Sequence, residues 1–122
     1  NTTGSGNVAV GLESLRMNTT GHSNTAVGKN ALQNETTAAN NVAMGFDAAQ
    51  ETTTGSRNTA IGSDAFEQNT TGDDNVAIGA NALDANTTAS NNTAVVIIQQ
   101  WVKMLYLITL QGLIILQWVT IL

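Results

Sequence analysis

Few residues in this chain could do chemistry. His22 is the one histidine among 122 residues, and Ser5, Ser56 and Asp73 occupy the equivalent position in other copies of a 17-residue repeat. A general base must lie within hydrogen-bond reach of the group whose proton it takes, and the sequence offers no nucleophile–base pair. We therefore interpret His22 as a solvated turn residue, and we expect no catalytic residues and no enzyme activity.

Carboxylates could bind divalent cations, which prefer oxygen ligands. Glu13, Asp47 and Asp64 share one position of the 17-residue unit or its neighbour, and Asp73-Asp74 is the one tight acidic pair. Calcium-binding β-rolls have dense Gly/Asp turns, which are missing here, so weak calcium binding at Asp73-Asp74 is a minor alternative. Cysteine is absent, and no Gly-Lys-Ser/Thr sequence indicates a phosphate loop. We expect no metal site and no cofactor.

These residues belong to a 17-residue unit that repeats along the chain. The motif Asn-x-Ala-apolar-Gly occurs six times, and the last copy breaks at Val96, where glycine is due. A fixed period of roughly 20 residues is typical of a solenoid. We call residues that are 17 apart a column. The motif columns are Asn7, Asn24, Asn41, Asn58, Asn75 and Asn92; Ala9, Ala26, Ala43, Ala60, Ala77 and Ala94; and Gly11, Gly28, Gly45, Gly62 and Gly79.

Each motif predicts one short β-strand that ends at its glycine. Because side chains alternate between the two faces of a strand, the variable apolar column shares a face with the Val/Thr column, and the alanine column faces the other way. One face can fill the coil interior, and the other needs a partner, either the Ala-Leu segment of the same coil or another chain. Aspartate at Val27 or Val95 should then bury an unpaired charge, and Ala43→Leu should be tolerated only if the alanine face is open.

The rest of the unit predicts a second strand and a turn. The Ala-Leu segment, as in Ala31-Leu32, is expected to be the second strand, since a few residues between glycines fall short of a stable helix. In the Asn-Thr-Thr-Gly sequence, as at residues 69–72, asparagine is expected to bond its own backbone and glycine to supply a positive φ. Stacked coils should form Asn and Thr ladders with a spacing of about 4.8 Å.

The composition limits the classes of partner that this chain could bind. The net charge is −5, and four Lys/Arg residues do not make a phosphate-binding stripe, so nucleic acid is not expected. Asn and Thr supply most of the polarity, which suits a hydrated extracellular surface. The apolar side chains of one repeat are few, and they oppose a backbone entropy of about 1–2 kcal/mol per residue, so oligomerisation is expected. We interpret the chain, which opens within a repeat, as part of a longer array.

Residues 1–95 resemble the head repeats of trimeric autotransporter adhesins and the repeat arrays of bacteriophage tail fibres. The adhesin pattern Ile-Ala-Ile-Gly-x-x-Ala-x-Ala-x-Gly is matched in its first half by residues 75–83, and the turn around residues 86–88 is longer. The resemblance implies an all-β fold, a parallel β-solenoid of the left-handed β-roll type in which each 17-residue unit forms one coil. It also implies a homotrimer on a cell surface or virion fibre, used for attachment to a cell-surface or extracellular-matrix receptor. No catalytic residue carries over.

Three functions follow from these observations. A non-enzymatic structural or adhesive segment of an extracellular fibre is the main prediction. The stacked Thr pairs leave an ice-binding solenoid as an alternative, although they lie in a turn and not on a flat strand. The third alternative is a membrane-anchored surface repeat protein, because residues 96–122 are almost wholly apolar and about 20 such residues can span a bilayer.

The apolar tail has a second interpretation. Lys103 and several glutamines interrupt it, and a lysine at mid-span is unfavourable. The sequence Gln-Trp-Val at residues 100–102 returns at residues 117–119, so the tail keeps the 17-residue period while losing the motif. Read one nucleotide earlier, Trp-Val contains GGT, the codon of the missing glycine. We therefore predict that residues 96–122 are a frameshifted continuation of the repeats, with a membrane segment as the alternative.

The coding DNA tests the frameshift. Restoring one G near the Val95/Val96 junction should reopen a long frame of further repeats. The nucleotide before the Ile98 codon should be A, the codon before Met104 should end in A, and the Leu110 codon should begin with C. If these nucleotides differ, or the restored frame stops at once, the tail should be tested as a membrane anchor by detergent partitioning.

Overall fold

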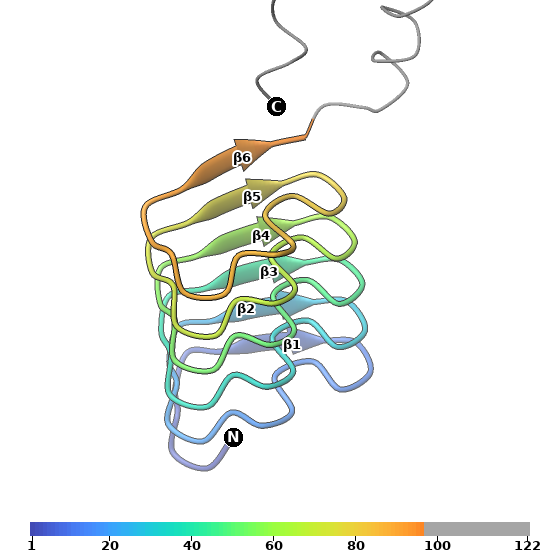
Figure 1. The fold of residues 1–122 in the computed structure, drawn as a ribbon. Coiled ribbons are helices and arrows are strands. Elements are labelled where there is room, and N and C mark those ends of the chain that lie inside the picture. Colours follow the sequence, from blue (N-terminus) through green and yellow to red (C-terminus); the bar gives the residue numbers. More distant parts are fainter. Residues whose placement is uncertain (97–122) are drawn as a thin grey trace, which may run out of the picture.

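The computed structural model describes residues 1–96, which wind into a parallel β-solenoid in which each 17-residue unit forms one coil (Figure 1). One sheet contains six strands in chain order. They are β1 (Val8–Val10), β2 (Thr25–Val27), β3 (Val42–Met44), β4 (Thr59–Ile61), β5 (Val76–Ile78) and β6 (Thr93–Val95). All neighbours are parallel and in register, from Ala9 opposite Ala26 to Ala77 opposite Ala94. The predicted fold class is therefore confirmed.

The tail interpretations concern residues 96–122, and all of these except Val96 lie outside the described residues. The boundary between the repeats and the tail, and the choice between a frameshift and a membrane segment, therefore stay predictions.

The motif glycine ends each strand for two physical reasons. Its φ lies between +111° and +143° in all five complete copies, a region that only glycine adopts readily. Successive coils also come very close here, because a Cβ on Gly45 would lie 2.6 Å from the carbonyl carbon of Gly62. Any side chain at this column would strain the backbone and collide with the next coil.

The predicted second strand is wrong, because the Ala-Leu segment forms turns in every coil. Its larger residue is left-handed, with φ between 49° and 59°, and so is the residue two positions earlier. Left-handed residues reverse the chain and cannot continue an extended strand. The two columns are Leu15, Leu32, Ala49, Phe66 and Leu83, and Glu13, Asn30, Asp47, Asp64 and Asn81. No helix forms there either, as expected.

The glycine of the Thr-Thr-Gly turn also plays a different role from the predicted one. Gly21, Gly55 and Gly72 do not have a positive φ. The positive φ falls two residues later, on a column that runs from Gly6 through Ser23 to Asn91. Gly21 is needed for space, since a Cβ there would lie 2.5 Å from the carbonyl oxygen of Ala38 in the next coil.

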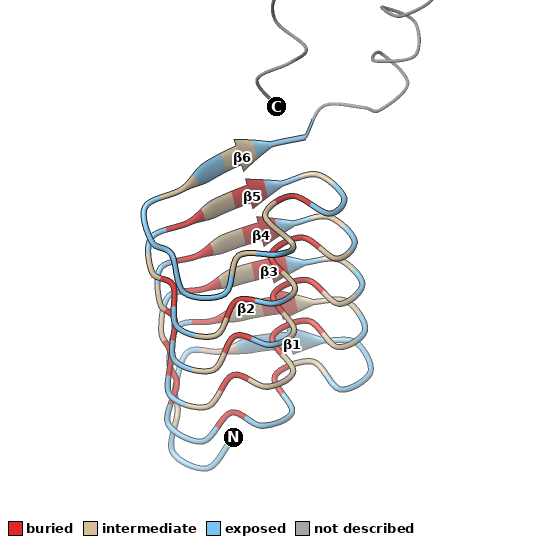
Figure 2. Cartoon of the chain, in the orientation of Figure 1, coloured by how far each residue is buried: buried red, intermediate tan, exposed pale blue. Residues whose placement is uncertain are grey.

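The alanine face of the sheet fills the coil interior. Ala26, Ala43, Ala60 and Ala77 are fully buried, together with the alanines of the Ala-Leu segment. Leu15, Leu32 and Phe66 add the largest apolar side chains of this core. In Figure 2 the middle residue of β2 to β5 is buried, while the last residue of β3, β4 and β5 is exposed. The interior therefore has room for methyl groups and for one larger side chain per coil.

The structure agrees with one expected effect of substitution, because the alanine face is closed, and corrects another. Ala43 has no exposed surface, so Ala43→Leu would overpack the core. Val95 is 47% exposed on the outer face, so an aspartate there would stay hydrated in a single chain and would not bury a charge.

A glycine substitution tests this packing. We expect Gly45→Ala to lower the free energy of unfolding by about 3 kcal/mol or more, because strain and collision add. Ser23→Gly is the control, since glycine already occupies this left-handed column at Gly6, and its effect should stay within about 1 kcal/mol. Urea unfolding followed by circular dichroism measures both, and equal stability of the two variants would contradict the structure.

Candidate functional site

A ladder of buried asparagines joins each strand to the next coil. The side-chain Nδ2 of Asn58 donates to the carbonyl oxygen of Gly72 at 2.8 Å. Its Oδ1 accepts from the backbone N–H of Asn75 at 2.9 Å. The equivalent two hydrogen bonds are made by Asn7, Asn24, Asn41 and Asn75. Each asparagine therefore fixes the start of the next strand and the turn that precedes it.

A threonine ladder runs parallel to it on the turn. The hydroxyl of Thr19 donates to the carbonyl oxygen of Thr36 at 2.9 Å, and Thr36 donates to Thr53 at 3.1 Å. The bond recurs from Thr2, Thr53 and Thr70. The second threonine of each pair is exposed in all six coils. Both predicted ladders are present. The first threonine of each pair is exposed at Thr2, Thr19 and Thr87 and half-buried in the coils between them.

The turn asparagines belong to a second polar column, whose burial the sequence did not indicate. It consists of Asn18, Glu35, Thr52 and Asn69, none of which is more than 2% exposed. In the regular coil, Asn69 bonds both the carbonyl and the N–H of Gly72, which closes the turn as predicted. Glu35 places a carboxyl group where the repeat has an amide, and this break in the repeat was the signal available in the sequence.

Burial has a direct electrostatic effect on Glu35. The interior disfavours the charged form and raises the pKa of this carboxyl to about 7, while the backbone N–H of Ala38 lowers it. Its Oε2 accepts from Asn24 Nδ2 at 3.3 Å. Its Oε1 has no hydrogen-bond partner, and neither has Asn18 Oδ1 in the preceding coil.

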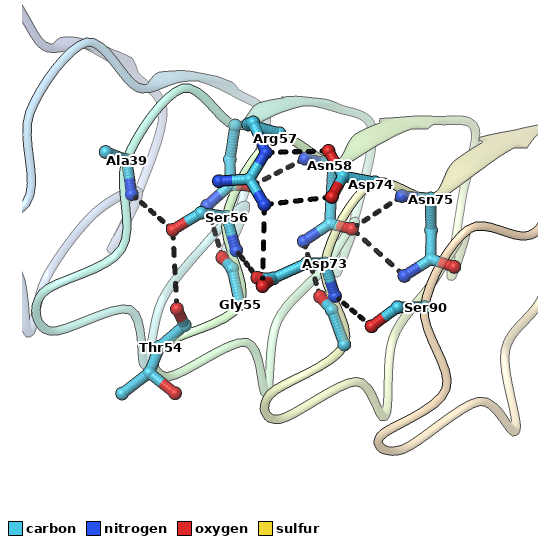
Figure 3. Close-up of polar contacts among 12 residues, drawn as sticks. Ala39, Thr54, Gly55, Ser56, Arg57, Asn58, Asp73, Asp74, Asn75 and Ser90 are labelled. Atoms are coloured by element: carbon cyan, nitrogen blue, oxygen red, sulfur yellow. Dashed lines mark hydrogen bonds and ion pairs between the residues drawn. The ribbon is translucent and has the colours of Figure 1, made fainter.

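The acidic pair Asp73-Asp74 binds an arginine of the preceding coil (Figure 3). Arg57 donates from Nε and Nη2 to the two oxygens of Asp74 at 2.6 and 2.8 Å, and its Nη2 lies 3.5 Å from Asp73. The Arg57 guanidinium lowers the pKa of Asp74. Asp73 also accepts the N–H of Ser56 at 2.7 Å. These carboxylates therefore serve coil-to-coil contacts.

The remaining candidates lie on the outside of the turns. His22 is exposed, and its carbonyl oxygen accepts from the N–H of Asn40. Partial burial, and then the carboxylates of Asp64 and Asp47, raise the pKa of Glu67, so acidic side chains gather on this side of the rod. Within residues 1–96, no cluster of three or more His, Cys, Asp and Glu side chains could hold a metal ion. The same residues contain no helix of the length and apolarity needed to cross a membrane.

The outer face of the sheet carries an apolar stripe, formed by the last residue of each strand. Its members are Val10, Val27, Met44, Ile61, Ile78 and Val95, and five of them are between 37% and 57% exposed. The Val/Thr column lies beside it on the same face and is half-buried in β2 to β5. Neither column contains a charged residue. An uncharged, largely apolar band therefore runs along the rod.

The fold and its ladders define a class, the β-solenoid repeat proteins, whose polar side chains hold coils together. Comparison of the chain with models of protein families, with curated proteins and with solved structures gives no match. The resemblance to adhesin and tail-fibre repeats therefore stays a prediction from the motifs.

The asparagine ladder predicts a large effect of a small change. Asn58→Ala leaves the buried N–H of Asn75 without its partner and removes a bond to Gly72, so the free energy of unfolding should fall by about 2–4 kcal/mol. Thr71→Ala removes a side chain of the exposed threonine column and should change it by less than about 0.5 kcal/mol. Thermal unfolding of both variants measures this, and a stable Asn58→Ala protein would show that the ladder is dispensable.

Proposed function

We propose that this chain is a non-enzymatic structural and adhesive segment of an extracellular fibre or surface adhesin, assembled as a homotrimer. The observation that carries the proposal is the apolar stripe, which extends over all six strands. Continuous exposed apolar surface commonly marks a protein–protein interface. The motif resemblance supports the same assembly and adds a cell-surface or extracellular-matrix receptor as its partner.

The stripe suits a second and third copy of the same chain. Each coil presents the same type of apolar side chain at the same place, so copies aligned side by side bring apolar residues together along their whole length. The stripe and its Val/Thr neighbours carry no charge, although the chain has a net charge of −5. Association through this face therefore buries no ionised group, which would be unfavourable without a partner.

The small apolar core of the single chain also supports association between chains. Alanine methyl groups form most of the core, and Leu15, Leu32 and Phe66 are the only large apolar side chains among the buried residues of 1–96. Burial of apolar area stabilises by roughly 25 cal/mol per Å², so small side chains contribute little. Burying the outer stripe would add a second apolar layer on the other side of the same sheet.

Substitution of the stripe tests the assembly. The unmodified protein should sediment at about three times the 12.7 kDa chain mass. Ile61→Asp should weaken association at least tenfold, which is about 1.4 kcal/mol, because it would bury a charge in the trimer. The variant should keep its β-sheet circular dichroism, since Ile61 is 38% exposed in the single chain.

Thr71→Asp is the matched control, because it places the same charge on an exposed turn residue outside the stripe. It should remain trimeric. A stable folded monomer of the unmodified protein, or equal association of the two variants, would overturn the trimer. Adhesion is tested separately, by the retention of protein-coated beads on cells and on matrix proteins, with beads carrying the destabilised Asn58→Ala protein as the reference.

Ice binding remains the second candidate because of one observation. The second threonine of each pair forms an exposed column: Thr3, Thr20, Thr37, Thr54, Thr71 and Thr88. The neighbouring column donates its hydroxyls to backbone carbonyls, from Thr2 through Thr70. Both rows lie on a turn, and hydroxyls of the first row are used in these bonds, so the threonines do not form the flat strand face that ice binding needs. We expect no thermal hysteresis, and a freezing-point gap that Thr54→Val abolishes would instead favour ice binding.

A further inference from the structure

Glu35 is out of place in the interior of the rod. Its column has asparagine at Asn1, Asn18, Asn69 and Asn86 and threonine at Thr52. Asparagine satisfies this position because its amide both donates and accepts within its own turn, as Asn69 does with Gly72. An ionised carboxylate can only accept. Glu35 is nevertheless fully buried.

Two buried acceptors meet between the first and second coils. Asn18 Nδ2 donates to the carbonyl oxygen of Gly21 in its own turn at 3.1 Å, and Asn18 Oδ1 also lies beside Gly21. This oxygen and Glu35 Oε1 both lie within 2.8 Å of the point that a Cβ on Gly21 would occupy, so they face the same narrow space. Neither has a hydrogen-bond partner. Two unpaired buried acceptors are unfavourable, and one added donor would satisfy both.

No charged neighbour would supply that donor or stabilise the anion. The polar side chains nearest to Glu35 in its column and its own coil are Asn18, Thr52 and Asn24, and none of them titrates. The other charged or titratable residues of the three coils concerned are exposed or half-buried on the outside, and none contributes to the shift at Glu35. They are Glu13, Arg16, His22, Lys29, Asp47, Glu51 and Arg57.

We propose that Glu35 is a proton-dependent clamp: its neutral carboxyl donates a hydrogen bond to Asn18 Oδ1 and ties the first coil to the second. The space between these oxygens is narrow, because Gly21, Asn18 and Ala38 surround it. A proton on the carboxyl group fits there without a cavity. When the proton leaves to water, two acceptors and a buried negative charge face each other, and this end of the rod loosens. The clamp is independent of the proposed function, because it acts within one chain.

The raised pKa gives the direction of the effect. The folded value of about 7 exceeds the ordinary value of 4.5, so the folded chain binds more protons than the unfolded chain between these two pH values. The stability that Glu35 contributes is therefore fully present below about pH 4.5, falls as the pH rises, and reaches a lower plateau above about pH 7. The unfolding equilibrium constant should rise by roughly 300-fold over this window.

The experiment compares unfolding of the 122-residue chain with Glu35→Gln between pH 4.5 and 8. Glutamine keeps a donor but does not titrate, so the decline in stability assigned to Glu35 should disappear. Glu51→Gln, which changes an exposed carboxylate of the next coil, should retain the decline. An identical pH profile in the unmodified protein and Glu35→Gln would overturn the clamp.

A titration of the unmodified protein tests the clamp even if the Glu35→Gln variant fails to fold. In the ¹³C-labelled unmodified protein, the carboxyl carbon of Glu35 should titrate near pH 7, and its ionisation should accelerate amide exchange in the first two coils more than in β4 and β5. A carboxyl carbon that titrates near 4.5, or stays ionised throughout because a cation replaces the proton, would overturn the proposal. Neither result depends on whether the chain is an adhesin or a trimer.

Discussion

The structure depends on in-register stacking of parallel coils, in which the strands and the buried asparagine ladder find their hydrogen-bond partners one coil away. Backbone hydrogen bonds pair the N–H and C=O groups of the strands. The asparagine side chains pair the backbone groups that come just before each strand. Asn58 reaches Gly72 and Asn75 in the next coil, and Asn41 makes the same bonds one coil earlier. Because an unsatisfied buried group costs about 1–3 kcal/mol, a slipped register would be penalised at every coil.

Stacking also tolerates backbone conformations that an isolated segment would avoid. Each regular coil places three residues other than glycine in the left-handed region, as Asp64, Phe66 and Arg57 illustrate. A left-handed residue costs roughly 1–2 kcal/mol. These conformations give the tight corners that let each repeat unit close on a core of alanines. The same tight approach makes the glycine columns intolerant of any side chain.

The two faces of the sheet have different roles: one stabilises the single chain, and the other is available for assembly. The alanine face is buried inside the coils of the chain, while the apolar stripe from Val10 to Val95 lies on the outside. The proposed trimer would cover that stripe, and the Asn- and Thr-rich turns would remain available to water or to a receptor. Glu35 adds a feature that the regular repeat lacks, because one buried carboxyl in place of an amide couples local stability to pH.

The sequence by itself determined the period, the strand positions and the ladders, because residues 17 apart must occupy equivalent places in stacked coils. It could not decide which strand face lies inside, since both faces are apolar and the choice depends on where the chain turns. The turn of the Ala-Leu segment is set by left-handed residues such as Leu32, whose conformation is imposed by packing and not by propensity. The roles of Gly21 and Glu35 likewise became visible only in the fold, because both depend on atoms of a neighbouring coil.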